Sequence, residues 1–419
     1  MSPLAVDRLG AGRDIYVDAV PPGVSVSIHQ LTTTDGAKVE GVLHALDGAT
    51  TVVTVMHPRQ SVTHHPMIPL FLRAGVAVWT QGSRSPNNDI ALVHEQALLD
   101  AAAGHVLLRD LGYRTVVTFG HSGGGTLSAF YIEQAALEPE LRLDVTPAGR
   151  PVALPGTRMP LPDAAIFLAP HPGQGQVLLH CIDPSVTDES DPMSVDADLD
   201  MYSPRNGFTP PPEPSRYHPD FLAAYRAAQL ERIARIDARA MEMAAEVAAA
   251  RRRFSRSGDP ADRRAGLAPR ILTTYRTDAD PCYVDLTIDP NDRHYGSLFG
   301  HRPDLINYGL VGFGRLTTPD AWLSTWSANR TNADFVRCAG GVRLPTLYLE
   351  FSGDQAALPA VSRRMFGALA STDKSRHVVR GQHFGQPIAD GEPTGYAAAA
   401  VHLDRWLSDR FETASPRTR

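Results

Sequence analysis

Over its first 170 residues the chain alternates short, continuous apolar runs with longer amphipathic stretches. The apolar runs are rich in β-branched residues, a pattern typical of strands buried on both faces of a sheet. They fall at residues 51–56, 76–80, 115–119 and 164–169. Two further strands, at 24–30 and 38–46, flank the turn sequence Thr-Asp-Gly. Helices are expected at 89–111 and 126–137, so the pattern predicts βαβ units and a mostly parallel sheet with helices on both faces.

The pattern changes near residue 171 and changes back near residue 343. A proline-rich run at 210–214 is followed by residues 218–254, which predict one long helix or two in series, and residues 279–310 are typical of loop. The α/β pattern then resumes, with strands at 346–351 and 376–379 and helices at 358–370 and 392–411. We therefore expect an α/β core at 1–170 and 343–419. A large, mainly helical cap at 171–342 would be inserted between two late strands.

The strand at 115–119 runs into Gly120-His121-Ser122-Gly123-Gly124 and then into a predicted helix. This fits the G-x-S-x-G nucleophile elbow, where a serine lies at a sharp strand-to-helix turn. Side chains at Gly120 and Gly124 would collide with the adjacent strand and helix, and the amides at the helix start would lie near an oxyanion formed at Ser122. The alternative is a glycine-rich turn that binds phosphate or only reverses the chain, although the dinucleotide pattern G-x-G-x-x-G is absent.

A serine hydroxyl needs a general base, and the base needs a carboxylate to orient it. In the elbow's chain order the acid and then the histidine follow the serine. Asp354 follows the strand at 346–351 and a turn glycine, so it is the predicted acid. Its alternative role is to cap the helix at 358–370. Glu350 and Asp183 are the lesser candidates.

His383 is the predicted general base. It lies in the glycine-flanked loop GQHFG just past the last strand, from where its ring can reach Ser122. The two other histidines after Asp354 fit less well, because His377 opens a strand and His402 lies within the C-terminal helix.

Together these residues resemble the triad frame of the α/β-hydrolase superfamily, over about residues 24–170 and 345–411. Members usually carry a cap where this chain has its insertion. The resemblance implies an oxyanion hole formed by the Gly123 amide and an amide from the loop after the strand at 51–56. That loop reads His-Pro-Arg-Gln, and proline has no N–H, so the second donor is expected to be Arg59 or Gln60.

Other polar residues at the same edge of the sheet are expected to contact the substrate. They are His57, His121 and His171. The segment that begins at His171 either lines the pocket or hinges the cap. The Arg59 guanidinium is a candidate contact for a substrate carboxylate or carbonyl, against the alternative of a surface arginine. A catalytic metal is not expected, because His64 and His65 have no HExxH spacing and no carboxylate at a helical interval.

The leading functional hypothesis is hydrolysis of a carboxylic ester or lactone through an acyl-enzyme on Ser122, with water as co-substrate and no cofactor. An amidase, an acyltransferase or a C–C bond hydrolase would use the same triad. A ligand-binding receptor that keeps the fold without turnover is the alternative of another class. These hypotheses share one partner, a small acyl compound, and differ in what becomes of it.

Composition narrows the setting. The chain has 419 residues, of which 43% are hydrophobic and 21% charged, as in an ordinary soluble globular enzyme. A net charge of −6 disfavours nucleic acid as a partner. The sequence has no apolar run of about 18 residues, so a membrane is not expected as a partner. The N-terminus does not resemble a signal peptide. Three widely spaced cysteines indicate free thiols in a reducing cytoplasm. The oligomeric state is open, with a homo-oligomer among the options.

Overall fold

The structure, a computed structural model, describes residues 20–414. The first 19 residues of the expected core, which include the segment inspected for a signal peptide, lie outside the described residues, as do the last five.

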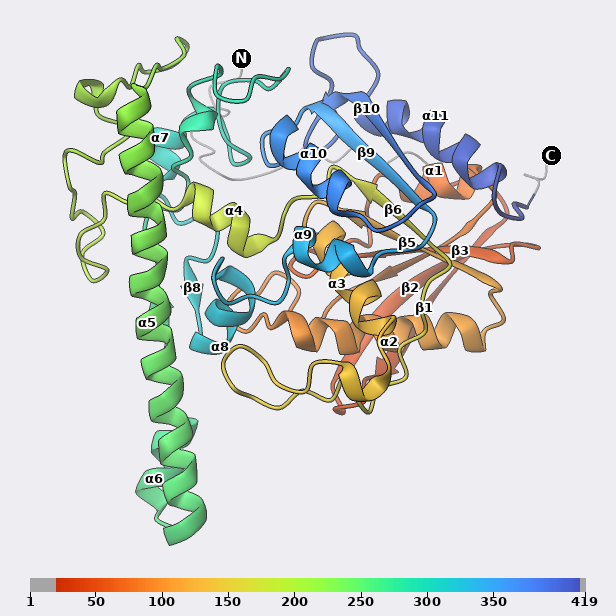
Figure 1. The fold of residues 1–419 in the computed structure, drawn as a ribbon. Helices are drawn as coiled ribbons and strands as arrows, with labels where there is room; N and C mark the ends of the chain where they lie inside the picture. Colours follow the sequence, from red (N-terminus) through yellow and green to blue (C-terminus); the bar gives the residue numbers. More distant parts are fainter. Residues whose placement is uncertain (1–19, 415–419) are drawn as a thin grey trace.

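An eight-stranded sheet forms the centre of the fold (Figure 1). Its order is β1-β2-β4-β3-β5-β6-β9-β10, and every neighbouring pair from β4 to β10 is parallel, whereas β2 runs antiparallel to both β1 and β4. The strands are Val24–Thr32 (β1), Lys38–Leu46 (β2), Thr51–Met56 (β3), Ala77–Gln81 (β4), Thr115–His121 (β5), Ala164–Leu168 (β6), Thr346–Gly353 (β9) and Lys374–Gln382 (β10).

Helices cover both faces of this sheet (Figure 1). On one face lie α1 (Ile68–Arg73) and α11 (Gly395–Ser408), and on the other lie α2 (His94–Asp110), α3 (Gly123–Ala135) and α10 (Pro359–Ala368). The strand β6 shows why the sheet needs both layers. Its residues are all buried, and they point alternately into the two apolar clusters. A mostly parallel sheet with helices on both faces confirms the predicted fold class.

Residues 169–345 connect β6 to β9, two neighbours in the sheet. Their helices are α4 (Gln174–Cys181), α5 (Pro219–Ser257), α6 (Pro260–Leu267), α7 (Pro303–Ile306), α8 (Pro319–Ala321) and α9 (Phe335–Cys338), with a two-stranded ribbon of β7 (Leu272–Thr273) and β8 (Leu316–Thr317). Most of this insertion has an apolar cluster of its own, in which α4 and α5 pack around Trp322 and Trp326. The last part, α9, packs instead on α3 within the core.

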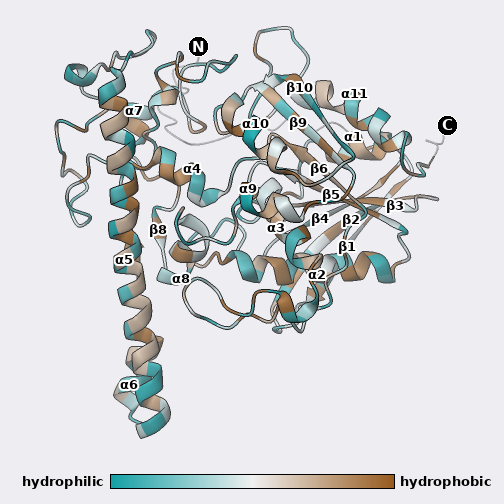
Figure 2. Cartoon of the chain, in the orientation of Figure 1, coloured by the Kyte–Doolittle hydropathy of each residue, from teal (hydrophilic) through white to brown (hydrophobic). Residues whose placement is uncertain are grey.

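The helix α5 stands to one side of the sheet in Figure 1, and α6 folds back along its far end. Its ends follow from local chemistry: His218 caps the start, Pro219 occupies the first turn, and Gly258 ends the helix in the left-handed region at φ 69°. Figure 2 shows hydrophobic and hydrophilic residues alternating around α5, whereas interior strands such as β5 are largely hydrophobic. This contrast is expected for a helix that covers a core with one face only.

Candidate active site

Ser122 lies at the turn between β5 and α3. Its backbone is held at φ 55° and ψ −126°, a region that non-glycine residues seldom adopt, and α3 begins with the next residue. The close fit of this turn explains two of its glycines. A Cβ at Gly120 would lie 2.5 Å from the Cα of Gly125, and one at Gly124 would lie 2.5 Å from the carbonyl oxygen of Met56. The turn therefore has the geometry of a nucleophile elbow.

The structure brings Ser122, His383 and Asp354 into one hydrogen-bonded chain. His383 Nε2 lies 2.8 Å from Ser122 Oγ, and His383 Nδ1 lies 2.9 and 3.0 Å from the two carboxylate oxygens of Asp354. All three residues are buried. The segments that carry them, the ends of β5, β9 and β10, are adjacent at the carboxyl edge of the sheet. The geometry that the catalytic assignment requires is present, and the assignment itself stays a prediction.

Asp354 is fixed from two sides. Besides His383, its Oδ1 accepts hydrogen bonds from the amides of Ala356 (2.6 Å) and Ala357 (3.0 Å). Both amides precede α10, whose N-cap is Leu358, so Asp354 does not cap that helix. The carboxylate cannot rotate away from His383 without losing these bonds.

The lesser candidates for the acid and the base lie elsewhere. His377 and His402 stack on each other with ring centroids 4.2 Å apart. Glu350 pairs with Arg376 and accepts from Ser362, and Asp183 bonds to Ser185 and Asn307 within the insertion. The structure places none of these four at Ser122.

His121 bonds to the loop of His383 and to His65, and its expected contact with a substrate stays a prediction. Its Nε2 donates to the carbonyl oxygen of His383 at 2.9 Å, and its Nδ1 lies 3.1 Å from His65 Nε2. His65 Nδ1 in turn accepts the Met67 amide at 3.2 Å, so the proton of the neutral His65 ring is on Nε2. His65 therefore donates to His121, and His121 donates to His383. Burial lowers the pKa of His65 to about 4, which keeps the ring neutral. Sequence reasoning gave His65 no role here; the two rings hold the His383 loop in place.

The loop after β3, which holds the candidates for the second oxyanion donor, folds back onto His57. The amides of Arg59 and Gln60 both donate to Nδ1 of His57, at 3.1 and 3.0 Å, so they are committed within the loop. The Arg59 guanidinium is also engaged, in a two-point ion pair with Asp89 at 2.6 Å and over the ring of Trp326. It is neither a surface arginine nor a free contact for a substrate carboxylate. Both amides among which the second donor was expected therefore have a partner within their own loop, and the identity of that donor stays a prediction.

His57 and His171 lie beside the elbow, and Gln174, from the segment expected to line the pocket or hinge the cap, joins them. A Cβ placed on Gly123 would lie 2.9 Å from Nε2 of His57, 2.9 Å from Nε2 of His171 and 2.5 Å from Nε2 of Gln174. We call these three side chains the Gly123 cradle. Gln174 is the first residue of α4 and belongs to the segment that begins at His171.

Side chains of the types that bind metal ions do not cluster in the described part of the chain. No group of three or more His, Cys, Asp or Glu side chains within residues 20–414 could hold a metal ion. The three cysteines are buried and free, so they form no disulfide. Over the same residues no helix has the length and apolarity needed to cross a lipid bilayer.

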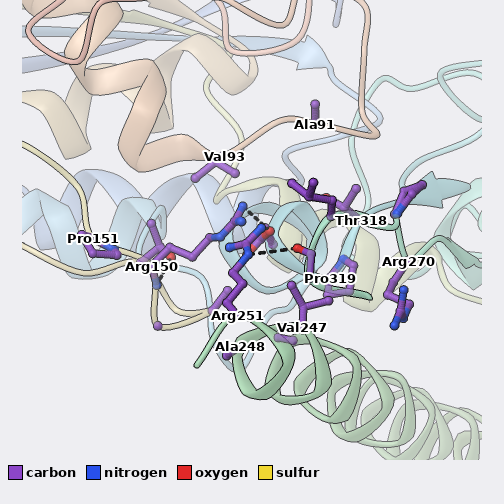
Figure 3. Close-up of a pocket in the computed structure, with 18 of the residues that line it drawn as sticks. Ala91, Val93, Arg150, Pro151, Val247, Ala248, Arg251, Arg270, Thr318 and Pro319 are labelled. Atoms are coloured by element: carbon purple, nitrogen blue, oxygen red, sulfur yellow. Dashed lines mark hydrogen bonds and ion pairs between the residues drawn. The ribbon is translucent and has the colours of Figure 1, made fainter. Parts of the chain in front are cut away.

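A separate groove of about 750 Å³ lies between α5, the start of α8 at Pro319 and the loop that carries Arg150 (Figure 3). Neither the triad nor the Gly123 cradle lines it. Arg150 pairs with Asp320 at 2.8 Å, and Arg251 donates to the Gly266 carbonyl at 3.0 Å. This groove is therefore distinct from the site at Ser122.

No family model matches the sequence, and no curated protein matches it. Among solved structures the chain is similar to DcsB in complex with its substrate analogue, at 12% identity and a TM-score of 0.47 over 92% of this chain and 99% of the other. It is also similar to the α/β hydrolase GrgF from Penicillium sp. sh18, at 11% identity and a TM-score of 0.43 over 92% of this chain and 97% of the other. A further similar structure is Est1E from Butyrivibrio proteoclasticus, at 10% identity and a TM-score of 0.42 over 92% of this chain and 98% of the other. Because these values are low, the fold assignment rests on the strand order and the turn at Ser122.

Proposed function

We propose that this chain, which has the α/β-hydrolase fold, is a serine hydrolase that cleaves a carboxylic ester or lactone through an acyl-enzyme on Ser122. The observation that carries the proposal is the buried hydrogen-bonded chain from Ser122 Oγ through His383 to Asp354. Hydrogen bonds that link a serine, a histidine and an aspartate, with the serine at a strained turn ahead of a helix N-terminus, have the geometry that nucleophilic catalysis needs.

In the proposed reaction, His383 Nε2 accepts the Ser122 proton while Oγ attacks the substrate carbonyl. Asp354 holds the proton on His383 Nδ1 and stabilises the imidazolium that forms. Collapse of the tetrahedral intermediate breaks the bond to the alkoxy group, which leaves with the proton from His383. Water then attacks the acyl-enzyme by the same steps, releases the acid and restores the serine.

The test combines a substrate panel with a covalent probe. Wild type and Ser122→Ala are assayed on p-nitrophenyl esters of graded chain length and on lactones, and both are treated with a fluorophosphonate. We expect the wild type to be labelled at Ser122 and to hydrolyse members of the panel, and Ser122→Ala to lose both properties. Turnover by Ser122→Ala on every substrate that the wild type cleaves would refute the acyl-enzyme.

The same experiment separates the alternatives. A chain that carries the triad but binds a ligand without turnover would not be labelled. A C–C bond hydrolase, an amidase or an acyltransferase would be labelled and yet turn over other substrates, and product analysis in ¹⁸O-labelled water would identify an acyltransferase by the absence of label in its product.

A further inference from the structure

We propose that Asn291, in the insertion, is a positioning residue for the proposed acid: it holds the backbone of Asp354 so that the carboxylate stays in line with His383. The inference rests on the proposed function and deepens it, because Asn291 acts on the same site through Asp354. The sequence indicated only loop at residues 279–310, where Asn291 lies, and gave no sign of such a role.

Asp354 lies just beyond the part of the sheet that aligns its strand with the strand of His383. The pairing of β9 with β10 ends at Gly353 and Gln382, the residues immediately before Asp354 and His383. The two amides that bond to Asp354 Oδ1 belong to the same turn, so they fix the carboxylate relative to that turn and not the turn relative to His383. The position of the turn relative to His383 therefore depends on contacts from outside the turn.

Residues 289–292 of the insertion supply contacts of that kind. Asn291 Nδ2 donates to the carbonyl oxygen of Asp354 at 2.9 Å. Two further hydrogen bonds lie on either side of it: the Asp292 amide donates to the Ser352 carbonyl oxygen at 2.9 Å, and the Ala360 amide donates to Asp289 Oδ2 at 2.8 Å. The insertion therefore holds the turn at Asp354 from the end of β9 to the first turn of α10.

The orientation of the Asn291 amide is set by partners on both sides. Its Oδ1 accepts the backbone amide of Arg293 at 3.2 Å and Nη1 of the same residue at 2.8 Å. Both of these groups can only donate, whereas the Asp354 carbonyl can only accept. The oxygen of the side chain therefore faces Arg293, and the amino group faces Asp354.

Arg293 makes the segment rigid from inside the insertion. The residue is buried, and its guanidinium also donates to four backbone carbonyls at 2.7 to 3.3 Å, those of Cys282, Asp285, Ile288 and Asp289. A side chain that links so many carbonyls fixes the path of the chain between them. Asn291 thus transmits the position of a rigid part of the insertion to the backbone of Asp354.

Two variants separate this contact from the fold of the insertion. Asn291→Asp keeps the oxygen that bonds to Arg293 and changes only the group that faces the Asp354 carbonyl, from a donor to an acceptor. Asn291→Leu removes both contacts at nearly constant volume. Asp292→Asn is the matched control, because the Asp292 side chain lies in an exposed ion pair with Arg380 and its backbone amide is unchanged.

The experiment measures kcat and KM on p-nitrophenyl butyrate and the second-order rate of fluorophosphonate labelling. We expect Asn291→Asp and Asn291→Leu each to lower kcat and the labelling rate about 10-fold, with KM within twofold of wild type, since one hydrogen bond is typically worth that much. The proton that His383 Nδ1 donates to Asp354 should give a low-field proton resonance in the wild type, and both variants should move it to higher field. Asp292→Asn should match the wild type in all three measurements.

The outcomes separate the two proposals. If the wild type is labelled but Asn291→Asp keeps kcat within twofold of it and leaves the low-field resonance in place, the positioning role is wrong and the serine hydrolase stands. If the wild type is not labelled at all, the proposed function fails and takes the positioning role with it. Thermal unfolding checks that each variant is folded. Should Asn291→Leu not be folded, Asn291→Asp, which keeps the bonds to Arg293, decides the test alone.

Discussion

Replacing Asp354 by asparagine separates what this residue does for folding from what it does for catalysis. Oδ1 accepts two backbone amides, those of Ala356 and Ala357, while both oxygens face His383 Nδ1. In Asp354→Asn the side-chain oxygen has to stay with the two amides, because an amino group there would oppose two N–H donors. The amino group then faces His383 Nδ1.

This arrangement reverses the histidine. With an N–H donor from the substituted side chain pointing at it, Nδ1 has to become the acceptor, and the proton moves to Nε2. His383 then donates to Ser122 Oγ across the 2.8 Å contact and cannot accept the serine proton. The wrong tautomer in a triad typically lowers kcat by about 10⁴-fold, which corresponds to about 5.5 kcal/mol of transition-state stabilisation.

The assay is kcat on the best ester of the panel, together with urea unfolding of the same protein. Stability should change by about 1 kcal/mol or less, because the amide bonds at Oδ1 survive. Asp292→Asn is the matched control: Asp292 lies in an exposed ion pair with Arg380 at 3.0 Å, and its loss should leave kcat within twofold. The reasoning is refuted if Asp354→Asn keeps more than a tenth of wild-type kcat.

Two further predictions concern other histidines. His65→Phe keeps an aromatic ring beside Phe119 but removes the donor to His121, so kcat should fall about 10-fold with KM unchanged. The control is His64→Phe, a change at an exposed neighbouring residue, which should have little effect. Equal kinetics for the two variants would show that His65 does not support the His383 loop. Burial lowers the pKa of His94 to about 4 and of His105 and His171 to about 3. Below pH 6.5 the unfolded chain therefore binds protons that the folded chain does not. The free energy of unfolding should decrease as the pH is lowered, by about 2 kcal/mol per ring from pH 7 to pH 5. Urea midpoints at the two pH values measure this, and an unchanged midpoint would contradict it.

The strands of the core were predictable because burial on both faces leaves a simple signature. The run TVVTVM coincides with β3, because both faces of that strand are buried and neither face needs polar residues. The edge strand β10 was underestimated, at 376–379 against Lys374–Gln382, because it exposes polar residues along one face. The helix expected at 89–111 begins only at His94. Residues before it are held by distant partners, as Asp89 is by Arg59 and the Ile90 carbonyl by Thr318.

Chain order and strand ends were sufficient to predict that Ser122, Asp354 and His383 meet, because parallel strands bring their carboxyl ends to one edge. They were not sufficient for the groups around them. The family resemblance placed the second oxyanion donor among the loop amides, and the proline without an N–H left Arg59 or Gln60 as the candidates. That reasoning is silent on whether Arg59 and Gln60 turn back to His57. Such a bond depends on backbone angles of the folded loop, which no residue pattern specifies.

The glycines of the elbow show where a local argument stops. Gly120 and Gly124 are required by the packing of the turn itself, against Gly125 and the Met56 carbonyl, and this follows from the motif. Gly123 has a different reason, because the atoms that would meet its side chain belong to His57, His171 and Gln174, from three other parts of the chain. A turn could accept a larger residue there if the three nitrogens were elsewhere. The absence of a side chain next to the nucleophile therefore follows from packing across three distant segments and not from the turn itself.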